Sequence, residues 1–247
     1  MSDFKRILKR ILHYHQIKPT DPLLDVFYST RFNYLDCGIS KNGTSSILAS
    51  IMSYDFEVPF DNEKKIWKQH GVYRSYNPQF RLIGNDFRPE DMERFEGYRK
   101  FIVLRDPMDR FISFINNTHK EDEYRYLIKM TDSPEKYVDS VLRIFPKMIN
   151  YESKDLRYDK HAVPQRVYYE KYRAIFGDSL EVVWLKDLPE FFEGITGLPL
   201  VKNNVTAKSQ YVCTKDSLTP KQLDTINGYI QKYEFPIQDE YTMLFKK

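Results

Sequence analysis

Apolar, β-prone runs that alternate with helical segments constrain the fold of this chain more than any other sequence feature. Three such runs are FNYLDCGI (residues 32–39), RLIGND (81–86) and KFIVLRD (100–106), and each is followed by a segment with helical spacing. A fourth run, SLEVVWLKDL (179–188), follows a mostly helical middle region. Strands that alternate with helices form mainly parallel sheets with right-handed crossovers. The sequence therefore predicts an α/β fold whose central, mainly parallel sheet is covered by helices on both faces.

Local start and stop signals define the predicted helices. Several begin with a proline, which is well tolerated in the first helical turn. The helix that begins near Pro164 is expected to end at Gly177. Thr219 is expected to cap a helix whose first residue is Pro220. Helices are predicted at residues 47–56, 88–98, 107–118, 133–145, 164–177 and 219–233.

The composition indicates one globular domain over residues 1–247. The chain has 41% hydrophobic and 15% aromatic residues, which is ample for a packed core. Its 38 basic and 35 acidic residues nearly cancel to a net charge of +3, so we do not expect a nucleic-acid partner. Cys37 and Cys213 form no CxxC pattern, and no run reaches the roughly 20 apolar residues of a membrane-spanning helix. We therefore expect a soluble, cytoplasmic protein.

Residues 1–18 predict a basic, amphipathic N-terminal helix. Apolar side chains recur at helical spacing between residues 4 and 12, with lysines and arginines on the opposite side. We expect the apolar stripe to pack on the domain. The alternative is peripheral contact with an anionic membrane surface through residues 4–12.

The loop SKNGTSS (residues 40–46) follows the first predicted strand and has the composition of an anion-binding site. In open parallel sheets, ligands bind beyond the carboxyl ends of the strands. Gly43 allows a tight turn, the following helix offers unpaired N–H groups, and Lys41 adds a cation. The loop does not fit GxxxxGK[ST], because Lys41 precedes the glycine, so a triphosphatase or a P-loop kinase is disfavoured. A capped helix start after a polar turn is the alternative interpretation.

The segment RDPMDRFIS (residues 105–113) is the second candidate anion site. Arg105 closes a predicted buried strand, so its side chain is expected at the ligand-binding edge of the sheet. Ser113 lies two turns along the helix that Pro107 begins. A guanidinium and a hydroxyl at this edge are suited to a phosphate that is not part of a diphosphate chain.

In residue type, spacing and order, these two motifs resemble those of the sulfotransferases that use 3′-phosphoadenosine 5′-phosphosulfate (PAPS). That family has a PKxGTT[ST]-like loop for the 5′-phosphosulfate and an RxPxxRxxS-like segment for the 3′-phosphate, whereas this chain has Ser40 where proline is usual. HAVPQ (residues 161–165) is similar to the HxxPQ element of carbohydrate sulfotransferases, and residues 233–245 are similar to their C-terminal segment. The resemblance implies a P-loop NTPase-like three-layer sandwich in a soluble, bacterial-type enzyme.

The resemblance also implies how the donor is held. Lys41 would contact the bridging and leaving oxygens of PAPS, while Arg105 and Ser113 would hold its 3′-phosphate. The backbone amides of the first loop would surround the 5′-phosphate, the product would be adenosine 3′,5′-bisphosphate, and no metal is required. The predicted donor-binding residues are Lys41, Asn42, Gly43, Thr44, Ser45, Ser46, Arg105, Ser113 and Asn204.

A general base is expected near the acceptor, because the acceptor hydroxyl must lose its proton as it attacks. His70 is the first candidate, since it lies in KQHGVYRSY (residues 68–76), a stretch that often carries the acceptor-side base in the family that the chain resembles. His161 is the second candidate. The other possible bases and the remaining histidines are Glu57, Asp61, Glu63, His13, His15 and His119.

The acceptor is expected to be a carbohydrate or polysaccharide hydroxyl. Aromatic residues cluster near His70, but aromatic faces stack on sugars and steroids alike. A small lipid, steroid or phenolic hydroxyl is therefore the near alternative. A protein that binds the nucleotide without catalysis is the further alternative.

Overall fold

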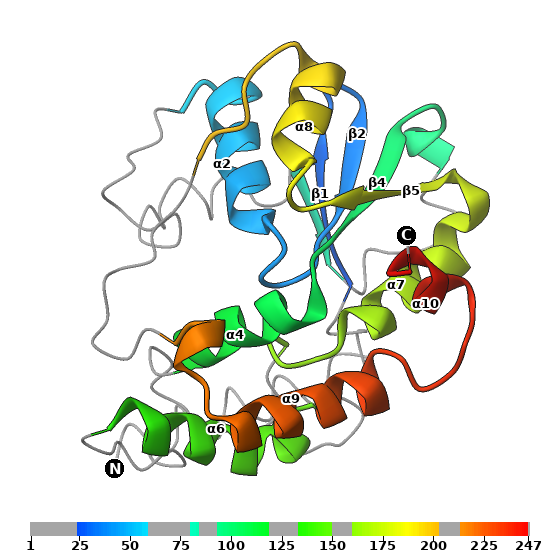
Figure 1. Cartoon of the computed structure of the whole chain (residues 1–247). Coiled ribbons are helices and arrows are strands. Elements are labelled where there is room, and N and C mark those ends of the chain that lie inside the picture. Colours follow the sequence, from blue (N-terminus) through cyan, green and yellow to red (C-terminus); the bar gives the residue numbers. More distant parts are fainter. Residues whose placement is uncertain are drawn as a thin grey trace, which may run out of the picture.

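The structure is a computed structural model, and it describes residues 24–58, 80–83, 93–118, 133–149, 160–202 and 213–246. Within these ranges the chain forms a five-stranded sheet with the strand order β3-β1-β2-β4-β5 (Figure 1). The strands are β1 (Asp25–Ser29), β2 (Tyr34–Cys37), β3 (Arg81–Ile83), β4 (Arg99–Leu104) and β5 (Leu180–Trp184). The last four of these lie inside the four runs predicted to be strands, with one residue of β4 outside.

The sheet is mixed, which corrects the prediction of a mainly parallel one. β2, β4 and β5 are parallel neighbours, but β1 pairs antiparallel with both β2 and β3. β1, which was not predicted, is joined to β2 by a short turn at residues 30–33 in which Asn33 has a positive φ of 52°. Only antiparallel neighbours can be joined by so short a connection.

Alternating side chains of the strands divide the core between the two faces of the sheet. Leu35 and Ile102 contribute to a cluster with α7 (Gln165–Phe176) and α10 (Glu240–Leu244). On the opposite face, Phe101 lies in a cluster with residues of α2 (Thr44–Tyr54) and α8 (Leu188–Thr196). The α/β class and the covering of both faces are therefore confirmed (Figure 1).

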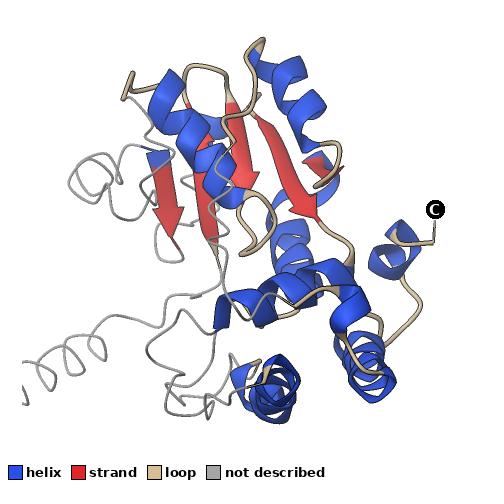
Figure 2. Cartoon of the chain, turned by 60° about the vertical axis from the view of Figure 1, so that its left-hand side comes forward, coloured by secondary structure: helices blue, strands red, loops and turns tan. Residues whose placement is uncertain are grey.

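Three helices form a separate layer with its own core. These are α4 (Pro107–Thr118), α6 (Pro134–Met148) and α9 (Pro220–Tyr233). Their contact is largely aromatic: the ring of Phe145 lies 4.6 Å from that of Phe111 and 5.0 Å from that of Tyr229, between centroids. In Figure 2 the sheet lies above this group of helices. α4 follows β4 directly, so the helical layer adjoins the edge of the sheet where parallel strands end.

The helix ends predicted from local signals are largely confirmed. Gly177 is the C-terminal cap of α7. Thr219 caps α9 through a hydrogen bond that Gln222 N–H donates to its hydroxyl, and Pro220 is the first helical residue. The prediction of a strand through residue 188 was wrong at its end, because Leu188 already begins α8.

Other predictions fall partly or wholly outside the described residues. Of the helix predicted at 88–98, a 3₁₀ turn is seen at residues 93–95, and residues 84–92 are not described. The predicted N-terminal helix also lies outside the described residues, and the single domain over the whole chain remains a prediction. Among the described helices, none has the length and apolar character needed to cross a membrane.

Asp36 makes the stability of the fold depend on pH. Its side chain is 1% exposed in the centre of the sheet, between Phe27 and Phe101 on the neighbouring strands. Its Oδ2 has no hydrogen-bond partner within the described residues. Burial raises the pKa of Asp36 well above its ordinary value, and the charge of Asp25 raises it further. The carboxyl therefore stabilises the folded state at acid pH, and that contribution is lost as pH rises through the raised pKa.

We predict that Asp36→Asn, which cannot titrate, gains stability relative to the wild type as pH increases. Denaturant unfolding of both proteins between about pH 5 and 9 measures the difference. The difference in the free energy of unfolding should grow in favour of the variant as pH rises and level off above the raised pKa of Asp36. A difference that stays constant with pH would contradict the raised pKa of the buried Asp36 carboxyl.

Candidate functional site

The SKNGTSS loop connects the carboxyl end of β2 to α2 through two left-handed residues. Lys41 has a φ of 76°, and Gly43, the residue before the helix, has a φ of 88°. The N–H groups of Ser46 and Ile47 donate to Gly43 O at 2.8 and 3.2 Å, so the N–H groups of Thr44 and Ser45 precede the first helical hydrogen bond. Such N–H groups at a helix start are suited to an anion.

At the beginning of α2, no capping side chain and no acidic residue of the first turn satisfies the free N–H groups. Gly43 supplies no side-chain cap, and the first turn of α2 has no acidic residue. The Thr44 hydroxyl donates to Ile39 O at 2.9 Å and so stabilises the loop instead of capping the helix. The positive end of the helix dipole therefore lacks a neighbouring carboxylate in its own first turn, which favours an external anion over an ordinary capped start.

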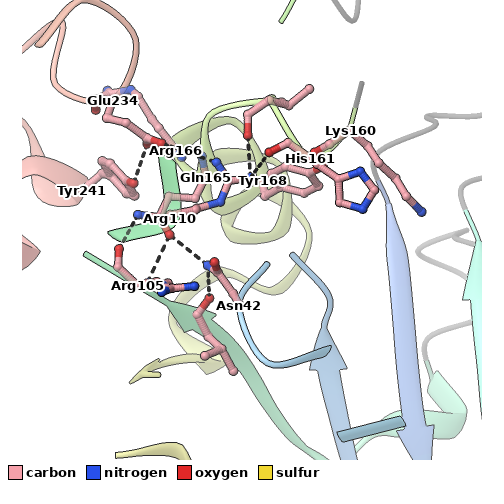
Figure 3. A network of polar contacts seen from close by, with 12 residues as sticks. Asn42, Arg105, Arg110, Lys160, His161, Gln165, Arg166, Tyr168, Glu234 and Tyr241 are labelled. Atoms are coloured by element: carbon pink, nitrogen blue, oxygen red, sulfur yellow. Dashed lines mark hydrogen bonds and ion pairs between the residues drawn. The ribbon is translucent and has the colours of Figure 1, made fainter. Parts of the chain in front are cut away.

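Asn42 anchors this loop to the sheet. The residue is 1% exposed, and its Nδ2 donates to Val103 O at 2.8 Å and to Gln165 Oε1 at 2.9 Å. Its side chain therefore points into the protein (Figure 3). If Asn42 assists a ligand, it does so through the shape of the loop and not through its amide.

Arg105 lies directly after β4 and in contact with the same loop. Its Nη1 donates to Lys41 O at 3.4 Å, so two motifs that are 64 residues apart in sequence meet at one edge of the sheet. Burial lowers the pKa of Arg105, an effect that Asp109 opposes. No carboxylate of the described residues forms an ion pair with it. A guanidinium that is half-buried and has no carboxylate partner among these residues is suited to bind a phosphate or sulfate.

Ser113 and Arg110, two other polar residues of RDPMDRFIS, differ from Arg105 in their burial and hydrogen bonds. Ser113 is half-buried on α4, and its hydroxyl makes no hydrogen bond within the described residues. Arg110, by contrast, is 4% exposed and donates through Nη2 to Val163 O at 2.8 Å and to His161 O at 3.4 Å. Arg110 thus binds backbone carbonyls, whereas Arg105 lies beside the loop.

His161 contributes its carbonyl to this network, but its ring points elsewhere. In Figure 3 the imidazole points away from Arg105 and Asn42. The residue lines a pocket in the helical layer whose wall includes Phe111, Phe145 and other aromatic side chains. The structure therefore does not bring the His161 ring to the SKNGTSS loop.

Gln165 is the site residue that the sequence analysis did not assign. It is fully buried; its Oε1 accepts from Asn42 and, at 3.2 Å, from the N–H of Arg105, and its Nε2 donates to Arg105 O at 2.6 Å. The sequence signal was available as the last residue of HAVPQ. No periodicity or charge pattern distinguished it from any other glutamine.

Most of the remaining predicted residues cannot be placed relative to the loop. His70 and Asn204 lie outside the described residues, as do His13, His15, His119, Asp61 and Glu63. Glu57 lies beyond the carboxyl end of α2, about 15 Å of helix away from the loop at its start. Among the described residues, no group of three or more metal-ligating side chains is found.

The described residues form an α/β fold in which a loop with exposed helix N–H groups follows one parallel strand, and an arginine with no carboxylate partner among those residues follows the next. A model of the sulfotransferase family matches residues 25–169, which is more than half of the 247 residues. The chain therefore belongs to the sulfotransferase family. The match includes both predicted phosphate motifs and HAVPQ (residues 161–165), and it supports an enzyme that transfers sulfuryl groups. No curated protein and no solved structure matches the chain significantly.

We predict that Gly43→Ala destabilises the protein by about 2 kcal/mol. Its φ of 88° disfavours any Cβ, and a Cβ would lie 2.8 Å from a Leu188 methyl and 2.9 Å from a Leu185 methyl. Two glycines are controls because a Cβ on either would have no described residue within 4 Å: Gly97 has a φ of 78°, and Gly194 lies inside a helix.

Chemical denaturation of the three variants separates strain from steric contact. Gly97→Ala should cost about 1 kcal/mol, and Gly194→Ala should be neutral or stabilise by up to about 1 kcal/mol. A Gly43→Ala variant as stable as Gly194→Ala would show that the loop does not need glycine at position 43.

Proposed function

We propose that this protein transfers the sulfuryl group of PAPS to a hydroxyl of a carbohydrate acceptor by in-line displacement. The observation that carries the proposal is the contact between the SKNGTSS loop and Arg105, joined at 3.4 Å from Arg105 Nη1 to Lys41 O. The proposed architecture is a P-loop NTPase-like three-layer sandwich, supported by helices on both faces of the sheet.

The proposed donor matches the separation of charge at this edge of the sheet. PAPS carries negative charge at two places, the 5′-phosphosulfate and the 3′-phosphate. The start of α2 with Lys41 supports binding of the first, and Arg105 with Ser113 supports binding of the second. A nucleoside triphosphate has one continuous anionic chain, and its usual loop has a lysine after the glycine, which is absent here.

In the proposed reaction, the acceptor oxygen forms a bond to sulfur as the bond from sulfur to the bridging phosphate oxygen breaks. Lys41 and the N–H groups of Thr44 and Ser45 stabilise the negative charge that develops on the leaving phosphate. Arg105 and Ser113 hold the nucleotide in register through its 3′-phosphate. The proton of the acceptor passes to a general base, and adenosine 3′,5′-bisphosphate leaves.

His70 is the first candidate for this base and His161 the second. The orientation of the His161 ring, away from Arg105 and Asn42, supports this order (Figure 3). The pocket that His161 lines among aromatic side chains has a volume of only about 20 Å³, which is room for about one water molecule and not for a phenol or steroid. A phenolic or steroid hydroxyl therefore remains the alternative acceptor on the grounds of the sequence alone.

We predict that the wild-type protein binds adenosine 3′,5′-bisphosphate in the micromolar range and ATP more weakly. Arg105→Ala should weaken bisphosphate binding about tenfold to a hundredfold, because a charge-assisted contact to phosphate is lost. Calorimetric titration measures this effect, and Arg143→Ala, at an exposed position on α6, is the control. A preference for ATP with magnesium would contradict PAPS as the donor.

We predict that alanine at the true base lowers kcat by about 10²- to 10⁴-fold and leaves bisphosphate affinity within about twofold. Sulfuryl transfer from labelled PAPS to a panel of oligosaccharides and phenols should be measured for His70→Ala and His161→Ala. Loss with His70→Ala supports the leading assignment. Loss with His161→Ala on phenols supports the phenolic alternative, and turnover by neither the wild type nor the variants supports a non-catalytic binding protein.

A further inference from the structure

Gln165 bonds to both proposed anion sites from a single buried side chain. It is the first residue of α7 and is 0% exposed (Figure 3). Its amide contacts Asn42 in the middle of the first loop and both backbone polar groups of Arg105. Because Asn42 lies between Lys41 and Gly43, the position of Gln165 determines where each anion site lies relative to the other.

The two hydrogen bonds to Arg105 fix its backbone in the manner of a neighbouring strand. Gln165 Oε1 accepts from Arg105 N–H at 3.2 Å, and Gln165 Nε2 donates to Arg105 O at 2.6 Å. β4 ends at Leu104, so Arg105 lies beyond the strand. The side-chain amide therefore replaces a strand partner at the residue that aims the guanidinium.

Gln165 is itself fixed by a buried carboxylate behind it. Glu234 Oε1 accepts from Gln165 N–H at 3.0 Å, and Glu234 Oε2 accepts from Arg166 N–H at 3.1 Å and from the Tyr241 hydroxyl at 2.8 Å. Glu234 is 6% exposed. Because its backbone is held by a buried carboxylate, Gln165 provides a fixed position for the groups that bond to its side chain.

We propose that Gln165 is a positioning residue that sets the separation between the 5′-phosphosulfate loop and the 3′-phosphate arginine. It thereby makes the site selective for nucleotides that carry a phosphate at both positions. The proposal rests on the proposed function and assigns a role that neither phosphate motif contains. Gln165 touches no reacting atom in this role; it acts through Asn42 and Arg105.

The test compares Gln165→Met with a matched control, Gln222→Met. Methionine has nearly the length of glutamine but neither donates nor strongly accepts hydrogen bonds. Gln222 is 2% exposed, and its amide accepts from Thr219 N–H at 3.0 Å and donates to Glu135 O at 3.1 Å and Asp139 Oδ1 at 2.8 Å. It has the same number of side-chain hydrogen bonds as Gln165, but it lies between α6 and α9.

The quantity to measure is the ratio of two dissociation constants, that of adenosine 5′-monophosphate over that of adenosine 3′,5′-bisphosphate. We expect a ratio of about tenfold to a hundredfold in the wild type and in Gln222→Met, and a ratio at least about fivefold smaller in Gln165→Met. A merely structural residue would lower stability and leave the ratio unchanged. A Gln165→Met ratio within about twofold of the wild type would overturn the proposal.

If the wild type binds neither nucleotide, the proposed function is refuted, but the positioning role of Gln165 is not yet tested. A second measurement, hydrogen exchange, tests that role without ligand. Hydrogen exchange without ligand should be faster at the amides of residues 41–46 and 105 in Gln165→Met than in Gln222→Met. Equal exchange in the two variants would overturn the positioning role. If Gln165→Met does not fold, Asn42→Ala removes the Gln165–Asn42 hydrogen bond, together with the bond from Asn42 to Val103 O, and leaves both bonds between Gln165 and Arg105 in place. It should change the ratio and the exchange in the same direction.

Discussion

The buried carboxylate of Glu234 is the interaction on which the arrangement of the layers depends. It accepts the first two N–H groups of α7, at Gln165 and Arg166, and the hydroxyl of Tyr241. A negative charge at a helix start is favoured by the helix dipole, and here it also satisfies donors that would otherwise be buried without partners. Arg110 is nearby, but its Nη1 is 3.9 Å from Glu234 Oε1, so the N–H groups and the hydroxyl are the stronger partners. One side chain thus joins the end of α9 to α7 and α10.

Local sequence signals correctly predicted the helix ends that are determined by interactions between neighbouring residues. α9 begins where Thr219 and Pro220 indicate, and α7 ends at Gly177, because caps and turns depend on a few adjacent residues. The mixed sheet was not predicted, because it depends on β1, a five-residue strand whose partners β2 and β3 are chosen by pairing across the chain. Hydrophobic pattern alone gives strand existence more reliably than strand direction.

The same division applies to the candidate site. That Lys41 and Arg105 would meet followed from one rule, that loops after parallel strands share an edge of the sheet. The inward direction of the Asn42 amide and the three hydrogen bonds of Gln165 did not follow, because each is fixed by partners more than 50 residues away in sequence. The role of a buried side-chain amide is seen only in the structure, which shows the donors and acceptors that it joins.

The two arginines of RDPMDRFIS show how the scaffold and the ligand site are separated within one motif. Arg110, one turn into α4, donates to the carbonyls of Val163 and His161 and so binds the segment that leads into α7. Arg105 precedes the helix and donates to Lys41 O at 3.4 Å, a long hydrogen bond, and most of its N–H groups have no partner among the described residues. Its charge is already partly removed from water in the folded protein. An arriving phosphate would therefore meet a cation whose desolvation has occurred on folding, and preorganised charge of this kind is more effective than charge that must be desolvated on binding.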